Sequence, residues 1–264
     1  MKIGFIGLGN MAKAMIGGML EQGIAKKEDI LGSAKTAATL SEMEEKYGIK
    51  TSDDNQEVAA FADVLILAIK PQFFGEVIPE IKGAVRKEAL IISIAAGKTI
   101  ADIEALFGRS IKLVRCMPNT PALVGAGCTG VCRNDNVSAE EMAKCMELTG
   151  SFGLSEEVPE RLIDAVAGVS GCSPAYVFLF MEALADGAVE AGMPRKQAYT
   201  FAAQAVMGSA KLMLETGKHP GELKDMVCSP AGTTIEGVRV LEEKGFRGAV
   251  MDAVKATVEK AKNM

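Results

Sequence analysis

The sequence is poor in the residues that most often bind metals or carry acid–base catalysis. Its 264 residues include one histidine, His219, in a Gly-Lys-His-Pro loop where we expect an ordinary exposed side chain. Cys128 and Cys132 cannot share an ion on a strand, because residues four apart there lie about 13 Å from one another. The chain also lacks a G-x-S-x-G elbow and an H-E-x-x-H pair. We therefore predict no metal site and no hydrolase of these types.

Other absences concern location and partners. No continuous apolar run reaches membrane-spanning length, and the net charge of −5 gives no basic field for nucleic acid. Lys13 and several glycines interrupt the apolar start of the chain, unlike a secretory signal. The six cysteines follow no paired framework, which is typical of reduced thiols. We expect a cytoplasmic protein that binds neither nucleic acid nor a membrane.

A glycine-rich turn separates the first apolar run from a stretch that can form a helix. Gly7 allows a tight turn after a strand, Gly9 lets the backbone approach phosphates, and Ala12 is small enough for the helix to pack on the sheet. The free N–H groups of the new helix favour an anion. The pattern predicts the pyrophosphate site of a dinucleotide, with a purely structural turn as the alternative.

The first 157 residues alternate apolar runs with helical stretches. The runs lack period-two alternation, as in parallel strands that are buried on both faces. Strands are expected at Lys2–Ile6, Asp29–Ser33, Val64–Ile69, Ala89–Ile94 and Lys112–Cys116, and helices at Thr36–Tyr47, Pro71–Gly83 and Thr99–Phe107. Edge strands are expected at Ala126–Cys132 and Ser151–Glu156, around a helix at Ser138–Thr149. This alternation predicts an α/β fold with a doubly wound Rossmann sheet and a ligand at the carboxyl ends of its strands.

From Pro159 onward the strand signals stop, and alanine, leucine, methionine and glutamate dominate. Helices are expected at about 160–168, 173–191, 195–216, 234–244 and 246–262. The sequence thus predicts an NADP-binding domain over 1–157 and an all-α domain over 158–264. Within the latter, Ala175–Leu184 is apolar on nearly all sides, which indicates a helix buried against a second subunit. The alternative is the central helix of a monomeric bundle.

The end of the second expected strand bears on the choice of cofactor. NAD-selective sites place an acid there to bind the ribose hydroxyls, whereas this chain has Ser33 and, two residues on, Lys35. A hydroxyl and a cation suit a 2′-phosphate, although Lys35 could also be an ordinary solvated lysine. The missing carboxylate favours NADPH, with NADH still possible.

Four loops combine polar, glycine and proline residues in apolar surroundings. The loops Ala68–Gln72, Ser93–Gly97 and Cys116–Pro121 follow expected strands, which would place them beside the pyrophosphate and nicotinamide. The fourth, Cys228–Ile235, opens a helix in the second half. Its consecutive hydroxyls and free N–H groups suit a small carboxylate, with plain N-capping as the alternative.

Six stretches of the chain resemble the pyrroline-5-carboxylate reductases, over the whole length. They are IGFIGLGNMAKAMIGG, AIKPQ, ISIAAG, RCMPNTPALVGAG, AVAGVSGCSPAYVF and CSPAGTTIEGV, of which the last two are the specific ones. The resemblance implies reduction of 1-pyrroline-5-carboxylate to L-proline by hydride transfer from NADPH, the last step of proline synthesis. It also implies a helical dimerisation domain in which two subunits interleave and complete each other's active sites, and in many members a ring of dimers.

The resemblance also implies individual site residues. Those expected at the cofactor are Gly7, Gly9, Asn10, Met11, Ser33, Lys35, Asn55, Ala68, Lys70, Pro71, Ala96 and Asn119. Those expected at the substrate are Val227, Ser229, Gly232, Thr233 and Thr234. Thr234 matches the threonine thought to hydrogen-bond the ring nitrogen and is the expected catalytic residue. Two positions depart from the family pattern, since Ala231 replaces the first glycine of the commoner S-P-G-G and Lys35 replaces a frequent arginine.

Two other functions fit part of the pattern. β-Hydroxyacid dehydrogenases have a similar glycine-rich start, but they need a lysine on the long helix after the nucleotide domain, and Leu162–Ala191 contains none. A non-catalytic NADP-binding regulator is the second. An imine carbon is already electrophilic, so a site without histidine or metal suits imine reduction. Turnover of the imine would separate the three.

Overall fold

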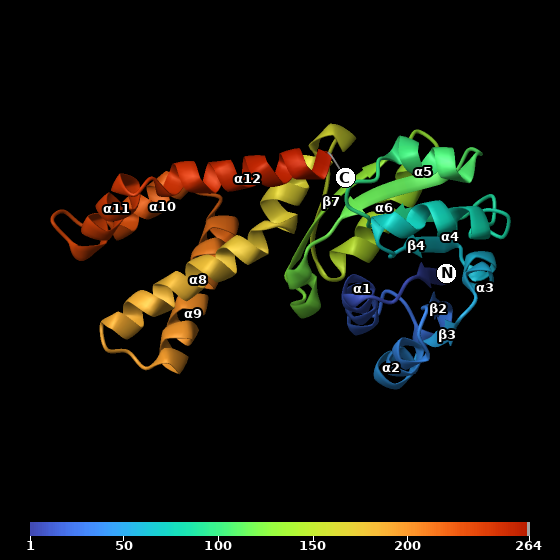
Figure 1. Ribbon diagram of the computed structural model, residues 1–264, viewed down its shortest axis with the longest axis horizontal. Helices are drawn as coiled ribbons and strands as arrows, with labels where there is room; N and C mark the ends of the chain where they lie inside the picture. The colour runs from blue at the N-terminus through green and yellow to red at the C-terminus, as the bar shows by residue number, and fades with distance from the viewer. Residues whose placement is uncertain (263–264) are drawn as a thin grey trace. The chain divides into compact units, whose positions relative to one another are not determined.

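The computed structural model describes residues 1–262 and divides into two compact units. The first comprises residues 1–172 together with residues 257–262, and the second comprises Ser173–Ala256. Each unit has its own architecture, drawn as a mixed sheet with helices and as a set of helices in Figure 1.

The described part of the first unit is built on an eight-stranded sheet, ordered β3-β2-β1-β4-β5-β6-β7-β8. Its strands are β1 (Ile3–Ile6), β2 (Ile30–Ser33), β3 (Lys50–Ser52), β4 (Val64–Leu67), β5 (Leu90–Ser93), β6 (Lys112–Met117), β7 (Gly127–Arg133) and β8 (Gly153–Glu157). Strands β1 to β6 are parallel, β7 is antiparallel to β6, and β8 is parallel to β7. The chain order reverses between β1 and β4, so the loops after these two strands flank the position where such sheets bind ligands.

Helices cover both faces of this sheet. They are α1 (Asn10–Glu21), α2 (Ala37–Tyr47), α3 (Asn55–Phe61), α4 (Phe74–Ile81), α5 (Ile100–Phe107), α6 (Ala139–Gly150) and the short α7 (Ile163–Val166). One apolar core contains side chains of α1, α2 and α6, and the other contains side chains of α3, α4 and α5. In β4, Val64 and Ile66 enter the first core while Leu65 and Leu67 enter the second. Because both faces of these strands are buried, their sequences are continuous apolar runs. The parallel strands with helices on both faces confirm the predicted α/β fold class.

The structure corrects several expected elements. The edge strand β3 and the helix α3 were not predicted, because Lys50–Ser52 is short and polar and α3 is a seven-residue helix. The expected helix Pro71–Gly83 is a 3-10 turn, η2 (Pro71–Phe73), followed by the shorter α4. The expected helix at 160–168 is a composite of a 3-10 turn, α7 and a π-helical turn at Ala167–Gly171.

The second unit is helical. It contains α8 (Ser173–Glu190), α9 (Arg195–Thr216), α10 (Pro220–Val227), α11 (Thr233–Glu243) and most of α12 (Phe246–Lys262). Helix α8 packs against α9, and the rings of Phe180 and Phe246 lie 6.0 Å apart. Ala185 is the one buried residue within α8, whereas Phe178 and Leu179 are 64% and 67% exposed. The apolar surface of α8 is therefore left largely uncovered within a single chain.

The stretch Glu160–Glu190 is long and apolar enough to cross a membrane by length and composition, which is weak evidence on its own. The sequence did not predict this stretch as a membrane-spanning helix, because it contains no uninterrupted apolar run of that length. A mean hydropathy over 18 residues allows up to two charged residues among those 18. A helix that is buried between protein subunits meets the same criteria.

Candidate active site

The loops after β1, β2 and β4 meet at Gly7. The Gly7 N–H donates to the Ser33 carbonyl oxygen at 3.0 Å, and Gly7 adopts a φ of +95° that favours glycine. A side chain on Gly7 would begin 2.8 Å from the Ala68 carbonyl oxygen. The structure therefore brings together Gly7, Ser33 and Ala68, which the sequence placed at the cofactor.

The start of α1 is open to an anion. Its N-cap residue is Gly9, which has no side chain to accept hydrogen bonds from the first-turn N–H groups. A Cβ on Gly9 would meet nothing within 4 Å, and the first turn, which begins with Asn10 and Met11, carries no acidic residue. Ala12 is buried in the core below. Free donors, open space and the positive end of the helix dipole fit the pyrophosphate of a dinucleotide.

Ser33 lies beside Gly7, but its hydroxyl is buried and hydrogen-bonded to another side chain. We expected its hydroxyl to hold a 2′-phosphate, but Ser33 is 1% exposed and donates to Asn55 Oδ1 at 2.7 Å. Asn55 in turn donates from Nδ2 to the Glu80 carboxylate at 3.3 Å. Ser33 therefore fixes the side chain of Asn55, and a phosphate at the end of β2 would depend on Lys35 and backbone donors.

Lys35 reaches from the end of β2 toward the start of α4. Its ammonium lies 3.7 Å from Glu76 Oε1 and 4.5 Å from the centre of the Phe73 ring, and its side chain is 68% exposed. Lys70 is also exposed and directly precedes Pro71, the first residue of η2. The two lysines thus stand at the loops after β2 and β4, where a cation can contact a nucleotide phosphate.

Asn119, in the loop after β6, is mainly engaged with the protein. It is 8% exposed, donates from Nδ2 to the Ser170 carbonyl at 3.0 Å and accepts from the Cys128 N–H at 2.8 Å. A single amide hydrogen is left for any cofactor. Ala96 is half-buried in the neighbouring loop after β5.

The loop before α11 forms a tight turn. The Gly232 N–H donates to the Ser229 carbonyl at 3.0 Å, which closes a turn with Pro230 and Ala231 at its centre. Ala231 has a φ of +58°, the conformation that the third position of a type II turn requires and that favours glycine. A Cβ on Gly232 would overlap Ser229 Oγ, so only glycine leaves this hydroxyl in place.

The hydroxyls of this loop are exposed at the start of α11. Ser229, Thr233 and Thr234 are all exposed, and so is Val227, the last residue of α10. The N-cap position is Gly232, so none of the three hydroxyl residues serves as the N-cap. Plain N-capping thus does not account for them, whereas a small carboxylate would find both hydroxyls and free N–H groups.

His219 has a structural role that the sequence did not indicate. It is exposed, as expected, and its Nδ1 accepts the Gly221 N–H at 3.0 Å, which caps the unpredicted helix α10. The proline after His219 was the available signal, because proline is favoured in the first turn of a helix. Within residues 1–262, no group of three histidine, cysteine, aspartate or glutamate residues could hold a metal ion.

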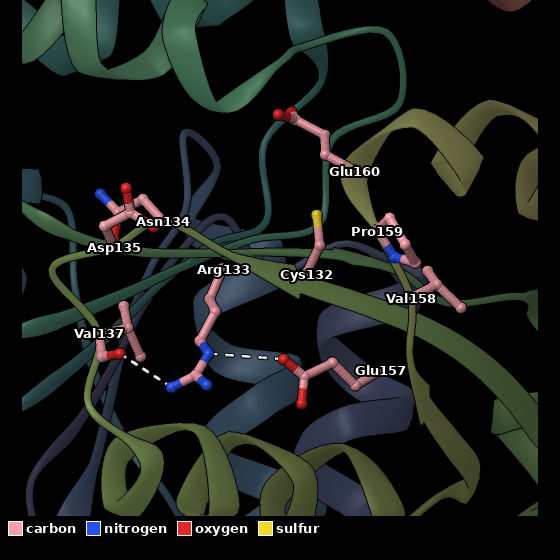
Figure 2. Close-up of a pocket in the computed structure, with 9 residues that line it drawn as sticks. All are labelled: Cys132, Arg133, Asn134, Asp135, Val137, Glu157, Val158, Pro159 and Glu160. Atoms are coloured by element: carbon pink, nitrogen blue, oxygen red, sulfur yellow. Dashed lines mark hydrogen bonds and ion pairs between the residues drawn. The ribbon is translucent and has the colours of Figure 1, made fainter.

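A further pocket, of about 480 Å³, lies at the end of β7 (Figure 2), which pairs with the amino end of the parallel strand β6. It is lined by Cys132, Arg133, Asn134, Asp135, Val137, Glu157, Val158, Pro159 and Glu160. Arg133 Nε lies 3.4 Å from Glu157, and burial together with Glu160 raises the pKa of the Cys132 thiol to about 11. None of the residues predicted for cofactor or substrate lines it, so this pocket is separate from the candidate active site.

The doubly wound sheet and the uncapped glycine start of α1 are those of a dinucleotide-binding protein. Family comparison agrees with this class: residues 2–97 match a model described as NADP oxidoreductase, coenzyme F420-dependent. Residues 160–264 match a model described as pyrroline-5-carboxylate reductase dimerisation.

Relatives match over the full length. A pyrroline-5-carboxylate reductase of Escherichia coli is 50% identical over 100% of this chain and 98% of its own length. A solved structure of a Coxiella burnetii pyrroline-5-carboxylate reductase has a TM-score of 0.93 and 36% identity, covering 99% of this chain and 97% of that one. A Plasmodium falciparum pyrroline carboxylate reductase with NADP bound has a TM-score of 0.89 and 34% identity, with 99% and 97% covered. The chain belongs to the pyrroline-5-carboxylate reductase family.

Proposed function

We propose that this chain reduces 1-pyrroline-5-carboxylate to L-proline with NADPH. The observation that carries the proposal is the exposed turn at Ser229–Thr234, where three hydroxyl residues surround a helix start that has no side-chain cap. Such a site binds a small carboxylate, and it occurs in a chain whose other half has an open helix start for a dinucleotide. Full-length relatives that carry this activity support the assignment.

The reaction needs little acid–base chemistry from the protein. When bound, NADPH would supply a hydride to the imine carbon, which is C2 of 1-pyrroline-5-carboxylate and becomes C5 of proline; the electron pair of the C=N π bond would move to nitrogen, which would take up a proton. Because the imine carbon is already electrophilic, correct placement of the two reactants can provide most of the acceleration. The chain's task is to bind the imine in one orientation.

We propose that Thr234 donates a hydrogen bond to the ring nitrogen. Ser229, Thr233 and the N–H groups that follow Gly232 bind the substrate carboxylate, with Val227 beside them. A threonine hydroxyl is a poor acid at neutral pH, so substrate or water supplies the proton. Thr234 therefore holds the nitrogen as its charge changes, and Ser229 holds a group whose charge stays constant.

We propose that the cofactor lies along the loops after β1, β2, β4, β5 and β6 and the start of α3. Gly7, Gly9, Asn10 and Met11 border the pyrophosphate, and Lys35 binds the 2′-phosphate. On the ribose side Asn55 is the contact residue, and Ser33 holds it through their hydrogen bond of 2.7 Å. The remaining expected contacts are Ala68, Lys70, Pro71, Ala96 and, through its one free amide hydrogen, Asn119.

Lys35 gives a direct test of the cofactor site. A charge-assisted phosphate contact is worth about 1.5–3 kcal/mol, and the exposure of Lys35 favours the lower end of that range. Lys35→Ala should therefore raise the Michaelis constant for NADPH about tenfold and leave that for NADH nearly unchanged. Equal effects on the two cofactors would contradict the assignment.

We propose that the functional unit is a homodimer formed by the helical domain, residues 158–264, and that residues 1–157 form the nucleotide domain. Uncovered apolar side chains on α8, such as Phe178 and Leu179, support an interface there, as does the dimerisation model that matches residues 160–264. A ring of dimers is the expected larger assembly, and the cytoplasm the expected location. Light scattering on dilute enzyme should show no active species of 27.7 kDa, the mass of one chain.

The function itself is tested by following nicotinamide oxidation with 1-pyrroline-5-carboxylate. Thr234→Ala should mainly lower kcat, since its contact matters most in the transition state, whereas Ser229→Ala should mainly raise KM. Each loss should be about 5- to 150-fold, and nucleotide affinity should stay unchanged in both variants. Full kcat and kcat/KM in Thr234→Ala would refute the catalytic role of this loop. Nucleotide binding without turnover by the unmodified chain would instead favour a non-catalytic regulator.

A further inference from the structure

The structure brings carboxylates to a place where the sequence shows none. The end of β2 carries no acid, but α4 presents Glu76 and Glu80, four residues apart and therefore on one face of the helix. The opposite face of α4 is fixed in the core by Phe74, Val77 and Ile78. The packing of α4 therefore fixes the backbone positions from which both glutamates extend.

Each carboxylate contacts a residue of the proposed adenosine site. Glu76 Oε1 lies 3.7 Å from the Lys35 ammonium, and Glu80 accepts from Asn55 Nδ2 at 3.3–3.4 Å. The Lys35 ammonium also lies over the Phe73 ring, at 4.5 Å from its centre. Lys35, the cation that would bind the 2′-phosphate, is therefore already paired with an acid.

A 2′-phosphate and the Glu76 carboxylate have the same sign of charge and share one cation. To bind NADPH, Lys35 must leave Glu76 or be shared with it, and the phosphate must lie near a negative charge. NADH has a hydroxyl in place of the phosphate, so it binds without disturbing this ion pair. The Glu76 carboxylate therefore weakens the binding of NADPH and leaves the binding of NADH unchanged.

We propose that Glu76 is a specificity-determining residue that weakens the preference of this enzyme for NADPH over NADH. The inference rests on the proposed function, because it assumes that the 2′-phosphate binds at Lys35. The Glu76 carboxylate reduces the contribution of Lys35 to the affinity for NADPH. Glu80 is held by the amide of Asn55 and does not contact the cation.

The test compares Glu76→Gln with the unmodified enzyme by calorimetric titration of NADP⁺ and NAD⁺, alongside the Michaelis constants of the reduced cofactors. Exposed ion pairs are worth up to about 1 kcal/mol, so the dissociation constant for NADP⁺ should fall about two- to fivefold. That for NAD⁺ should stay unchanged. The gain should shrink as salt is raised, because the charges involved are solvent-exposed. The Glu76 side chain is 67% exposed, so the variant should fold normally.

A matched control separates a local effect from a change in net charge. Glu88 pairs with Lys112 at 2.9 Å near the amino ends of the parallel strands, whereas the proposed cofactor site lies at their carboxyl ends. Glu88→Gln removes the same charge and should leave both dissociation constants unaltered. Equal tightening in the two variants would overturn the proposal, as would an unchanged NADP⁺ constant in Glu76→Gln.

Lys35→Ala distinguishes failure of this inference from failure of the cofactor assignment. If Lys35→Ala weakens NADP⁺ binding and Glu76→Gln has no effect, the site is correct and the role of Glu76 is wrong. If neither substitution changes NADP⁺ binding, the 2′-phosphate does not bind at Lys35, and the assignment on which the inference rests is also wrong.

Discussion

Ala231 stands in a backbone conformation that an alanine adopts only at a cost. Its φ of +58° at the third position of the Ser229–Gly232 turn brings the Cβ close to the following carbonyl, which costs a non-glycine residue about 1–2 kcal/mol. Glycine would remove this cost, but it would lower the stability by about 0.4–1 kcal/mol because it gives the unfolded chain more conformational freedom. Ala231→Gly should therefore stabilise the protein by about 0.5–1 kcal/mol, or raise Tm by about 1–4 °C.

The assay is thermal and urea unfolding at one fixed protein concentration, since association contributes to the stability of a dimer. Ala126→Gly is the matched control: Ala126 is an exposed loop residue, and Ala231 is the one non-glycine residue with positive φ among residues 1–262. The control should lose about 0.4–1 kcal/mol, opposite in sign to Ala231→Gly. The reasoning about strain is refuted if both glycine variants are destabilised alike.

Two other changes test contacts described above. Ser33→Ala removes the hydroxyl that holds Asn55, and it should weaken NADP⁺ and NAD⁺ binding by similar factors, which calorimetry can distinguish from the selective effect of Lys35→Ala. Asp102 accepts from the Thr99 hydroxyl and N–H at the start of α5, and these bonds lower the pKa of its carboxyl below the usual 3.8. Its stabilising effect is therefore full above pH 3.8 and lost as the pH falls through the lower folded pKa. Asp102→Asn should lower the free energy of unfolding by up to about 1 kcal/mol at neutral pH, because an amide oxygen accepts these two bonds more weakly than a carboxylate, and by nothing well below that pKa; urea unfolding measures both.

Continuous apolar runs predicted the central sheet well because burial on both faces determines them. Residues 64–67 of β4 alternate between two apolar cores, so each residue must be apolar, and the resulting run is visible in the sequence. The edge strand β3 pairs with a single neighbour, its residues are half-buried or exposed, and no apolar pattern marks it. Helix α3 did carry a signal, since Asp54 accepts from the Gln56 N–H as its N-cap.

The motifs predicted the backbone of the site better than its side chains. Gly7 has the positive φ that a tight turn after the first strand requires, and Gly9 has the open space that its predicted approach to phosphates needs. The burial of Ser33 against Asn55 depends on two segments 22 residues apart, and the contact of Lys35 with Glu76 depends on the position of α4 in the fold. No local pattern encodes such contacts, so they required the structure.

Each of the two proposed ligand sites contains the start of a helix that has no side-chain cap. Helices α2, α5 and α6 are capped by the side chains of Thr36, Thr99 and Ser138, the last two in reciprocal capping boxes. Helices α1 and α11 begin instead after glycines, Gly9 and Gly232, which offer no side-chain acceptor. A capped helix start has satisfied part of its hydrogen-bonding capacity, whereas an uncapped one leaves its N–H groups and positive dipole end for an external anion. The pyrophosphate of the cofactor and the carboxylate of the imine are both anions, so one physical arrangement serves the two halves of the reaction.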